Sequence, residues 1–510
     1  MPTAPSWSSA TRSTVDVGHL IRFRLTAARG RRRSWWAAFL MLALTVAAAV
    51  VPAYLPGADA AIESHTRAVE VLVLLPTAYA AFLGLAVVSA VASGGGRELL
   101  PREQAVAYPV SPTTDHLGAL LMAPLNIAWL LQAWLLLGAT AYGMGSSGLL
   151  VAQPVTVLWL LAATAVGQVV AWTMEAVRRG RGGPVASRAL IGLAAAAVAA
   201  VYFSGNLTAL LDRLPTRELV VGMLVGFGWT WALVVLVEAG ILLGAVVLGI
   251  WPARVAARRL PHDEQRIESG VHQARPLAAS DLGALLRIDR ASVWRAVPMR
   301  RGLAVLAIGP GLVALAGDLP WVAMTVLPGL VASGAALLFG VNAWCLDGRG
   351  ALWRENLPVA AGTVFTARAI VLAEFLLLAS AVSLVLASLR AGAPEPHEIV
   401  ALVCTWLVVT VQVLASAMTW SLRNPFAVDL RSARATPAPP VVMVGYSARL
   451  ALLTTTTGLV FSGLARLPAW EMSVLVAVPL LLFATRRLVR AHAGWVDPVA
   501  RSRVVSVVSS

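Results

Sequence analysis

Residues 68–93 read AVEVLVLLPTAYAAFLGLAVVSAVAS, and Glu70 is the only charged side chain in this run. A helix of about 20 mostly apolar residues can cross the roughly 30 Å hydrocarbon core of a bilayer. Similar stretches recur along the chain, with short polar segments between them. The sequence therefore predicts an all-α integral membrane protein with many spans.

The apolar stretches predict about 12 transmembrane helices. These spans are expected at 35–55, 68–93, 117–143, 149–173, 188–210, 218–251, 302–317, 320–345, 366–389, 398–421, 441–463 and 468–488. The stretch 302–317 is short. The stretch 218–251 is too long for a single crossing, so we expect an interfacial turn or an extension into the cytoplasm there.

The arginines between the spans orient the chain. All 40 basic residues are arginines, and with a cytoplasmic N-terminus the outside loops hold only Arg67, Arg213, Arg217, Arg390 and Arg466. The other 35 lie on the inside, as the positive-inside rule requires. We expect a plasma (inner) membrane protein with both termini cytoplasmic. The net charge of +15 is explained by topology and by attraction to anionic lipid rather than by nucleic-acid binding.

Composition excludes several kinds of site. A P-loop needs a lysine on the phosphates, and the chain has none. The chain therefore cannot hold an ordinary ATPase site, and any ATP and Mg²⁺ are expected in a separate subunit. The two cysteines, Cys345 and Cys404, fall within predicted spans and suggest neither a disulfide nor a metal site.

Three sequence echoes divide the chain into halves. GRELLPRE at 96–103 and GRGALWRE at 348–355 agree at five of eight positions. FSG followed by RLP occurs both in 203–215 and in 461–468, and GHLIR at 18–22 resembles GALLR at 283–287. Because the echoes keep their order, we predict two parallel six-helix repeats related by a pseudo-twofold axis along the membrane normal.

This repeat predicts the domain organisation. The expected parts are a cytoplasmic arm with an interfacial helix (1–34), a first transmembrane half (35–251), a basic connector with a second entry helix (252–301), a second transmembrane half (302–488) and a cytoplasmic tail (489–510).

The inside loops 94–115 and 346–365 carry both signs of charge, whereas orientation requires only arginine. A short helix of mixed charge suits a docking surface for a cytosolic partner, although solvated turns with incidental ion pairs are an alternative. The candidate docking residues are Arg97, Glu98, Arg102, Glu103, Asp347, Arg349, Arg354 and Glu355.

Polar side chains inside spans are candidates for a translocation cavity. They are Asn126, Gln132, Glu238, Glu374 and Gln412. The alternative for the amides is hydrogen bonding between helices, worth about 0.6 kcal/mol each. For the two glutamates, the alternative to a cavity or proton-linked role is a buried structural pair.

An entry helix, six spans, a charged loop after the second span and the YPVSP or LPV element before the third resemble the ABC-2 type permease family. The fused, double-length form resembles permeases of actinobacterial antibiotic and drug exporters. The resemblance implies that the two charged loops are coupling helices for ATPase subunits, with two copies per chain. It also implies that this chain is a permease component without enzyme activity or a cofactor of its own. In that family, short re-entrant helices often lie on the outer side at the places of 203–218 and 461–471.

Two other classes remain open. A proton-coupled 12-helix secondary transporter fits the span count, but its usual Gly-x-x-x-Asp-Arg-x-Gly-Arg-Arg loop is replaced by GGGRELLPRE at 94–103. A membrane transferase would need clustered acids or histidines, and the first outer loop offers only Asp59, Glu63 and His65.

Overall fold

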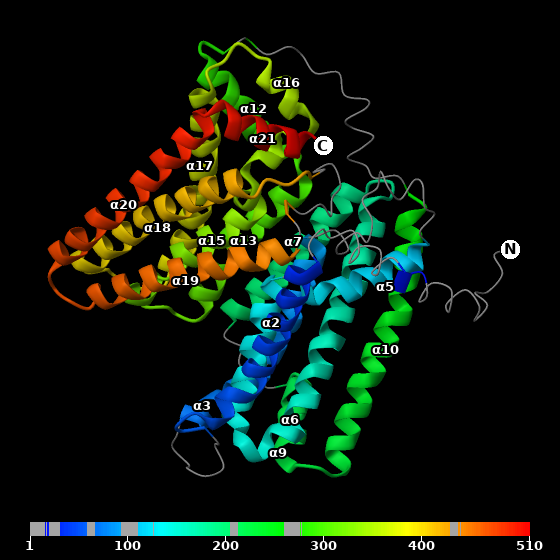
Figure 1. Ribbon diagram of the computed structural model, residues 1–510. Helices are drawn as coiled ribbons and strands as arrows, with labels where there is room; N and C mark the ends of the chain where they lie inside the picture. The colour runs from blue at the N-terminus through cyan, green and yellow to red at the C-terminus, as the bar shows by residue number, and fades with distance from the viewer. Residues whose placement is uncertain are drawn as a thin grey trace. The chain divides into compact units, whose positions relative to one another are not determined.

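The computed structural model describes residues 16, 18–19, 31–58, 67–92, 111–125, 127–204, 213–259, 276, 278–428, 437–438 and 440–510 (Figure 1). These residues form helices, turns and short links, and no β-strand occurs among them. The chain divides into two compact units, Met1–Val271 and His272–Ser510, and each is described by itself.

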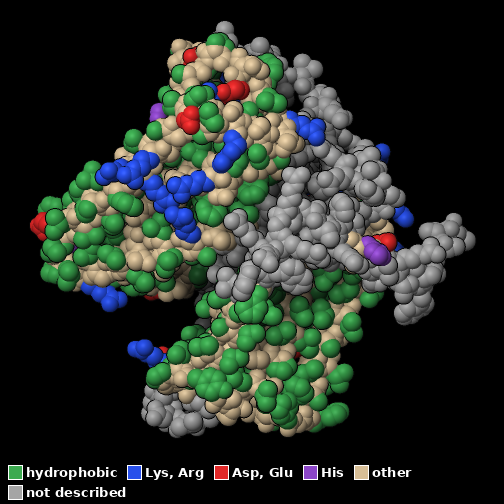
Figure 2. All heavy atoms as spheres, in the orientation of Figure 1, with side chains coloured by type: hydrophobic (Ala, Val, Ile, Leu, Met, Phe, Trp, Pro, Cys, Tyr) green, Lys and Arg blue, Asp and Glu red, His purple; other side chains and the backbone are tan. Residues whose placement is uncertain are grey.

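Eight helical segments in the described residues are long and apolar enough to cross a membrane, so the chain is a multi-pass membrane protein. They are Arg67–Val91, Gln132–Arg178, Trp229–Ala257, Met299–Ala316, Trp321–Leu346, Ala361–Ser388, Pro396–Arg423 and Trp470–Val496. Hydrophobic side chains cover most of the visible surface of α6 and α10 in the first unit (Figure 2), as lipid contact requires.

The helices of the first unit are α2 (Arg31–Val50), η1 (Val51–Tyr54), α3 (Arg67–Ala92), α5 (Pro112–Met122), η2 (Ala123–Leu125), α6 (Ile127–Arg178), α7 (Gly183–Phe203), α9 (Thr216–Val225) and α10 (Trp229–Ala257). The long stretch 218–251 is interrupted between α9 and α10, where Gly226 has φ 82°. This break confirms that the stretch is not one continuous helix. Helix α10 also runs on to Ala257, beyond the expected end of the span.

Helix α6 folds back on itself at Gly145, where φ is 62° and ψ is −174°. The Gln153 side-chain amide donates to the Leu137 carbonyl (3.1 Å), and Trp129 Nε1 donates to Thr164 Oγ1 (2.8 Å). These pairs bracket Gly145, so the two arms run antiparallel. The expected spans 117–143 and 149–173 therefore correspond to the arms of one helical hairpin. This turn explains why α6, at 52 residues, is too long for a single bilayer crossing.

The second unit contains α12 (Asp281–Arg295), α13 (Val297–Ala316), α14 (Trp321–Met324), α15 (Leu327–Phe339), η3 (Gly340–Leu346), η4 (Gly348–Gly350), α16 (Ala351–Glu355), α17 (Ala361–Ser388), α18 (Pro396–Arg423), α19 (Pro440–Leu464), α20 (Trp470–Val496) and α21 (Pro498–Ser509).

Three expected spans are helical but are not among the eight. The described parts of the stretches 35–55, 188–210 and 441–463 correspond to α2, α7 and α19. The expected layout of twelve spans therefore contains more crossings than the eight long apolar helices show. Between α19 and α20 no re-entrant helix forms, because only five residues separate Leu464 from Trp470. Most residues of the first entry segment, and residues 205–212 of the stretch 203–218, lie outside the described part of the chain.

Corresponding helices pair in the same way within each unit. The first span packs on the third, as α2 on the first arm of α6 and as α13 on α17. The fourth packs on the sixth, as the second arm of α6 on α10 and as α18 on α20. These pairings are what two copies of one six-helix plan would produce.

Replacing Gly311 with valine is expected to destabilise the second unit. A Cβ atom at Gly311 would lie 2.7 Å from the Ser383 carbonyl oxygen and 2.8 Å from Leu386 Cβ, both on α17. Such overpacking costs about 1–3 kcal/mol, so the unfolding temperature of the detergent-purified protein should fall. Gly309→Val is the matched control, because nothing lies within 4 Å of a Cβ there. Equal effects of both changes would contradict this account of the α13–α17 contact.

Candidate functional site

Helix α12 packs one of its faces against the other helices of the second unit. The Ser280 hydroxyl caps its start by accepting from the Gly283 amide (3.1 Å). Leu285, Asp289 and Val293 follow at helical spacing and are all buried. The expected second entry helix is therefore present, and its buried face carries a carboxylate that needs a partner.

Arg368, fully buried on α17, supplies that partner. Arg368 Nε donates to Asp289 Oδ2 (2.9 Å), and Nη2 donates to Asp289 Oδ1 (3.1 Å) and to Asp347 Oδ1 (2.9 Å). Its Nη1 donates to the Ala343 carbonyl. Arg354 of α16 completes the group, with ion pairs to Asp289 (2.6 Å) and Asp347 (2.7 Å). We call Asp289, Asp347, Arg354 and Arg368 the four-charge network.

The four-charge network is balanced, with two acids and two bases. Burial alone would raise the pKa of Asp289, but the charges and hydrogen bonds of Arg368 and Arg354 outweigh burial and hold that pKa below its ordinary value. The carboxylate therefore stays ionised. The network joins α12, α16 and α17 with the link that carries Asp347, so these four segments are braced against one another.

The short helix α16 is held on one side and free on the other. Ala351 is buried, and Arg354 points into the four-charge network. Leu352 and Trp353 are 54% and 74% exposed. A large aromatic side chain on a rigid support is the usual core of a protein-binding surface. We call Leu352 and Trp353 the α16 face.

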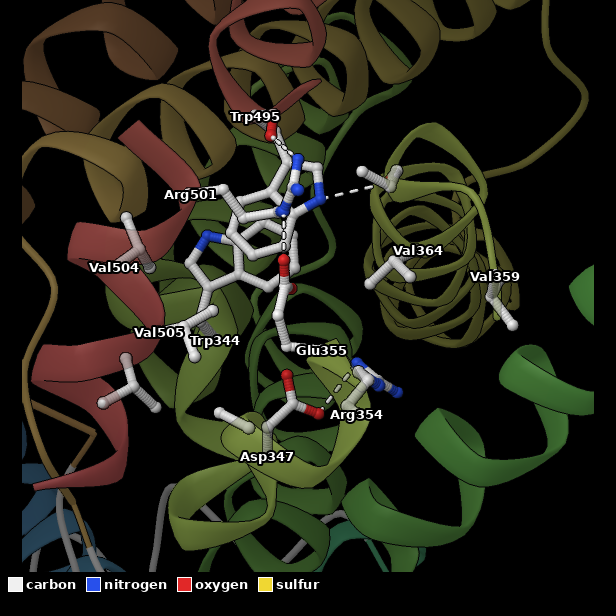
Figure 3. Close-up of a pocket in the computed structure, with 13 residues that line it drawn as sticks. Trp344, Asp347, Arg354, Glu355, Val359, Val364, Trp495, Arg501, Val504 and Val505 are labelled. Atoms are coloured by element: carbon white, nitrogen blue, oxygen red, sulfur yellow. Dashed lines mark hydrogen bonds and ion pairs between the residues drawn. The ribbon is translucent and has the colours of Figure 1, made fainter. Parts of the chain in front are cut away.

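Helix α21 packs beside α16. Arg501 Nε donates to Glu355 Oε1 (2.6 Å), and the Trp344 and Trp495 rings stack with centroids 3.6 Å apart. These residues line a cavity of about 90 Å³ that Val504 and Val505 of α21 close from one side (Figure 3). The expected cytoplasmic tail is thus folded, and its first residues support the loop that carries α16.

The candidate docking residues fall into three groups. Arg97, Glu98, Arg102 and Glu103 lie outside the described residues. Asp347, Arg354 and Glu355 form ion pairs within the chain, and Arg349 lies exposed in η4. The charges at Asp347, Arg354 and Glu355 hold the loop in place, while the exposed surface is the α16 face. Docking itself stays a prediction.

The candidate cavity residues have different surroundings. Asn126 lies outside the described residues, and Gln132 is half-buried. Gln412 accepts a hydrogen bond from Thr457 Oγ1 (3.0 Å), a contact between α18 and α19. Glu374 pairs with Arg290 of α12 (2.5 Å) and is 40% exposed. Glu238 is buried on α10, and neither carboxylate oxygen has a hydrogen-bond partner among the described residues.

Sequence reasoning missed Arg368 as a site residue. It lies within the apolar stretch after the second charged loop, where it was counted among the inside arginines. A charged residue seven positions inside a membrane helix is a signal that could have found it. Comparison with protein-family models, curated proteins and solved structures gave no significant match, so the functional argument rests on this site and on the sequence.

Proposed function

We propose that the chain is the permease subunit of an ATP-driven (ABC) exporter. It would move an amphipathic or hydrophobic compound, such as an antibiotic or drug, out across the plasma membrane. A separate ATPase subunit, in two copies per chain, would bind ATP and Mg²⁺ and dock on the inside loops. The chain itself would carry no catalytic residue.

The main observation behind the proposal is that ion pairs to other helices hold the α16 face in place. A coupling surface must bind its partner and transmit the partner's movement without collapsing. Arg354 and Glu355 directly follow the exposed Trp353, and both are tied to other helices by ion pairs. Displacement of α16 would therefore act on α12 and α17 through the four-charge network.

The distribution of charge favours a cytoplasmic location for this surface. The Arg354–Asp289 ion pair joins α16 to α12, and α21 packs on α16, so α12, α16 and α21 lie at one end of the second unit (Figure 1). The arginines of this end include Arg287, Arg290, Arg295, Arg300, Arg301, Arg349, Arg501 and Arg503. The positive-inside rule assigns such an end to the cytoplasm. With α12 and α21 on the same side, an even number of crossings lies between them.

Purification of the tagged chain from its native host in mild detergent tests the proposal. We expect a soluble P-loop ATPase in stoichiometric amount when the co-purifying proteins are identified by mass spectrometry. A chain that purifies alone, with no ATPase even after crosslinking, would refute the exporter assignment.

A proton-coupled secondary transporter is the second candidate. The buried Glu238, whose carboxylate has no hydrogen-bond partner among the described residues, favours it. Under this mechanism, Glu238→Gln should abolish efflux of a lipophilic fluorescent dye, and a proton uncoupler should do the same to the unmodified protein. Glu374→Gln is the comparison, because Glu374 already has Arg290 as an ionic partner. Normal efflux by the Glu238→Gln protein would exclude this mechanism.

A further inference from the structure

Three arginines converge from different helices in the second unit. Arg423 ends α18, Arg449 lies in α19 and Arg487 lies in α20. Arg487 is half-buried and donates to Ser416 Oγ on α18 (3.1 Å), so its side chain is directed towards the neighbouring helix. Arg449 and Arg423 are the charged groups that act on Arg487 most strongly. We call the three residues the arginine cluster.

The register of α18 and α19 fixes the level of the arginine cluster. The Trp420 and Tyr446 rings are in contact, with centroids 5.4 Å apart. Because the two helices run antiparallel, Arg449, three residues after Tyr446, is level with residue 417, three before Trp420. Ser416, the partner of Arg487, is at this same level. Arg449 therefore lies at the level of Ser416, to which Arg487 donates.

No carboxylate compensates this charge within the three helices. The only acidic residues in α18, α19 and α20 are Glu398 and Glu471, and each lies in the first turn of its helix. Arg487 and Arg423 lie near the other ends. Three neighbouring guanidinium groups without an acid repel one another and attract an anion.

The Tyr446 hydroxyl is a second, independent observation that points to a bound ligand. Its side chain is fully buried, and its hydroxyl has no hydrogen-bond partner among the described residues. A buried, unsatisfied hydroxyl costs about 1–3 kcal/mol. The charges of Arg487 and Arg449 act on this hydroxyl, so it belongs to the same locality. An anion with several acceptor oxygens would satisfy all these donors.

Exposed apolar side chains continue from the arginines along the same helix faces. Leu452 follows Arg449 by three positions and is 73% exposed, and Phe483 precedes Arg487 by four and is 68% exposed. Figure 2 shows basic side chains gathered over α18–α20, with hydrophobic side chains farther along these helices. A ligand with a phosphate headgroup and acyl chains matches this arrangement, in which a basic surface is followed by an apolar one.

We propose that the arginine cluster, together with the Tyr446 hydroxyl, binds the headgroup of an anionic phospholipid, whose acyl chains cover Leu452 and Phe483. Basic pockets between transmembrane helices on the cytoplasmic side are suited to such headgroups. This site is independent of the proposed transport function.

The test uses the full chain purified in detergent. Phosphatidylglycerol is added, and binding is followed by native mass spectrometry and by the unfolding temperature. Arg449→Gln/Arg487→Gln should bind it about 30-fold more weakly, because each arginine near a headgroup contributes about 1 kcal/mol. Arg287→Gln/Arg295→Gln, which removes two exposed arginines of α12, should bind it like the unmodified protein.

Phosphatidylcholine and inorganic phosphate are the comparison ligands, and neither should raise the unfolding temperature. If phosphate stabilised the protein as well as phosphatidylglycerol, the site would be one for a free anion. Equal weakening in both double variants would show only diffuse attraction. Either result would overturn the proposal.

Tyr446→Phe keeps the test valid if the double arginine variant does not fold. Without lipid, this variant should be at least as stable as the unmodified protein, because it removes an unsatisfied hydroxyl. With phosphatidylglycerol, it should bind more weakly. Unchanged lipid binding in the Tyr446→Phe protein would count against the site.

Discussion

Replacing Arg368 with leucine is expected to destabilise the second unit by about 3–5 kcal/mol, because it leaves Asp289 and Asp347 with Arg354 as their shared counter-ion. Removal of one partner from a buried group of charges costs far more than the net contribution of the intact group. The measurement is thermal or denaturant unfolding of the detergent-purified protein. A loss below 1 kcal/mol would show that the four-charge network is not a structural brace.

Arg290→Gln is the matched control for Arg368. Arg290 also joins α12 to a carboxylate of α17, but the Arg290 and Glu374 side chains are 47% and 40% exposed. Exposed pairs contribute about 0–1 kcal/mol, so this variant should unfold almost like the unmodified protein. Asp289→Asn, Arg368→Leu and the variant with both changes complete a double-mutant cycle that measures the coupling of the two residues.

Acid provides a second measurement on the same network. The pKa of Asp289 is lowered in the folded protein, so its contribution to stability is present above its unfolded pKa of about 3.9. That contribution is lost as the pH falls through the lowered folded value. The Arg368→Leu protein should lose part of this acid-dependent stabilisation, because one of the two groups that lower the pKa is gone.

Trp353→Ala is expected to abolish stable association with the ATPase while leaving the permease folded. Trp353 is 74% exposed and forms no part of the four-charge network, so its removal should change the unfolding temperature little. A central aromatic residue in an interface contributes about 2 kcal/mol or more to binding, which corresponds to about 30-fold in affinity. The measurement is the amount of ATPase that co-purifies per chain.

Trp470→Ala is the control for the loss of an exposed tryptophan. Trp470 is 47% exposed and starts α20, at the end opposite to Trp495 and α21. This variant should retain the ATPase. If Trp353→Ala retained it equally well, the α16 face would not be the docking surface.

Much of the fold follows from apolar run length. The repeated stretches predicted helices and a multi-pass membrane protein, and the break between α9 and α10 was anticipated because 218–251 exceeds one bilayer crossing. The layout of twelve spans in two repeats stays a prediction. The turn of the α6 hairpin at Gly145 also falls between two expected spans, 117–143 and 149–173.

The site was harder to predict because its charges come from separate segments. Mixed charge drew attention to 346–365, but the partners of Asp347 and Arg354 lie on α12 and α17. The repeat gave no help either. Arg354 corresponds to Arg102, whereas the positions of Asp347 and Asp289 correspond to Gly95 and Arg24, so the sequence does not repeat the two acids at these positions.

The α6 hairpin bears on how the chain enters the bilayer during synthesis. Its two arms are joined through Gly145 by residues without charge. The turn therefore has no arginine that would hold it on the cytoplasmic side of the membrane. We therefore expect the pair to enter together, as one unit. Its direction is set by Arg178 at the end of the second arm and by Arg179 and Arg181 just after it. Moving these arginines to the turn would be the way to invert it.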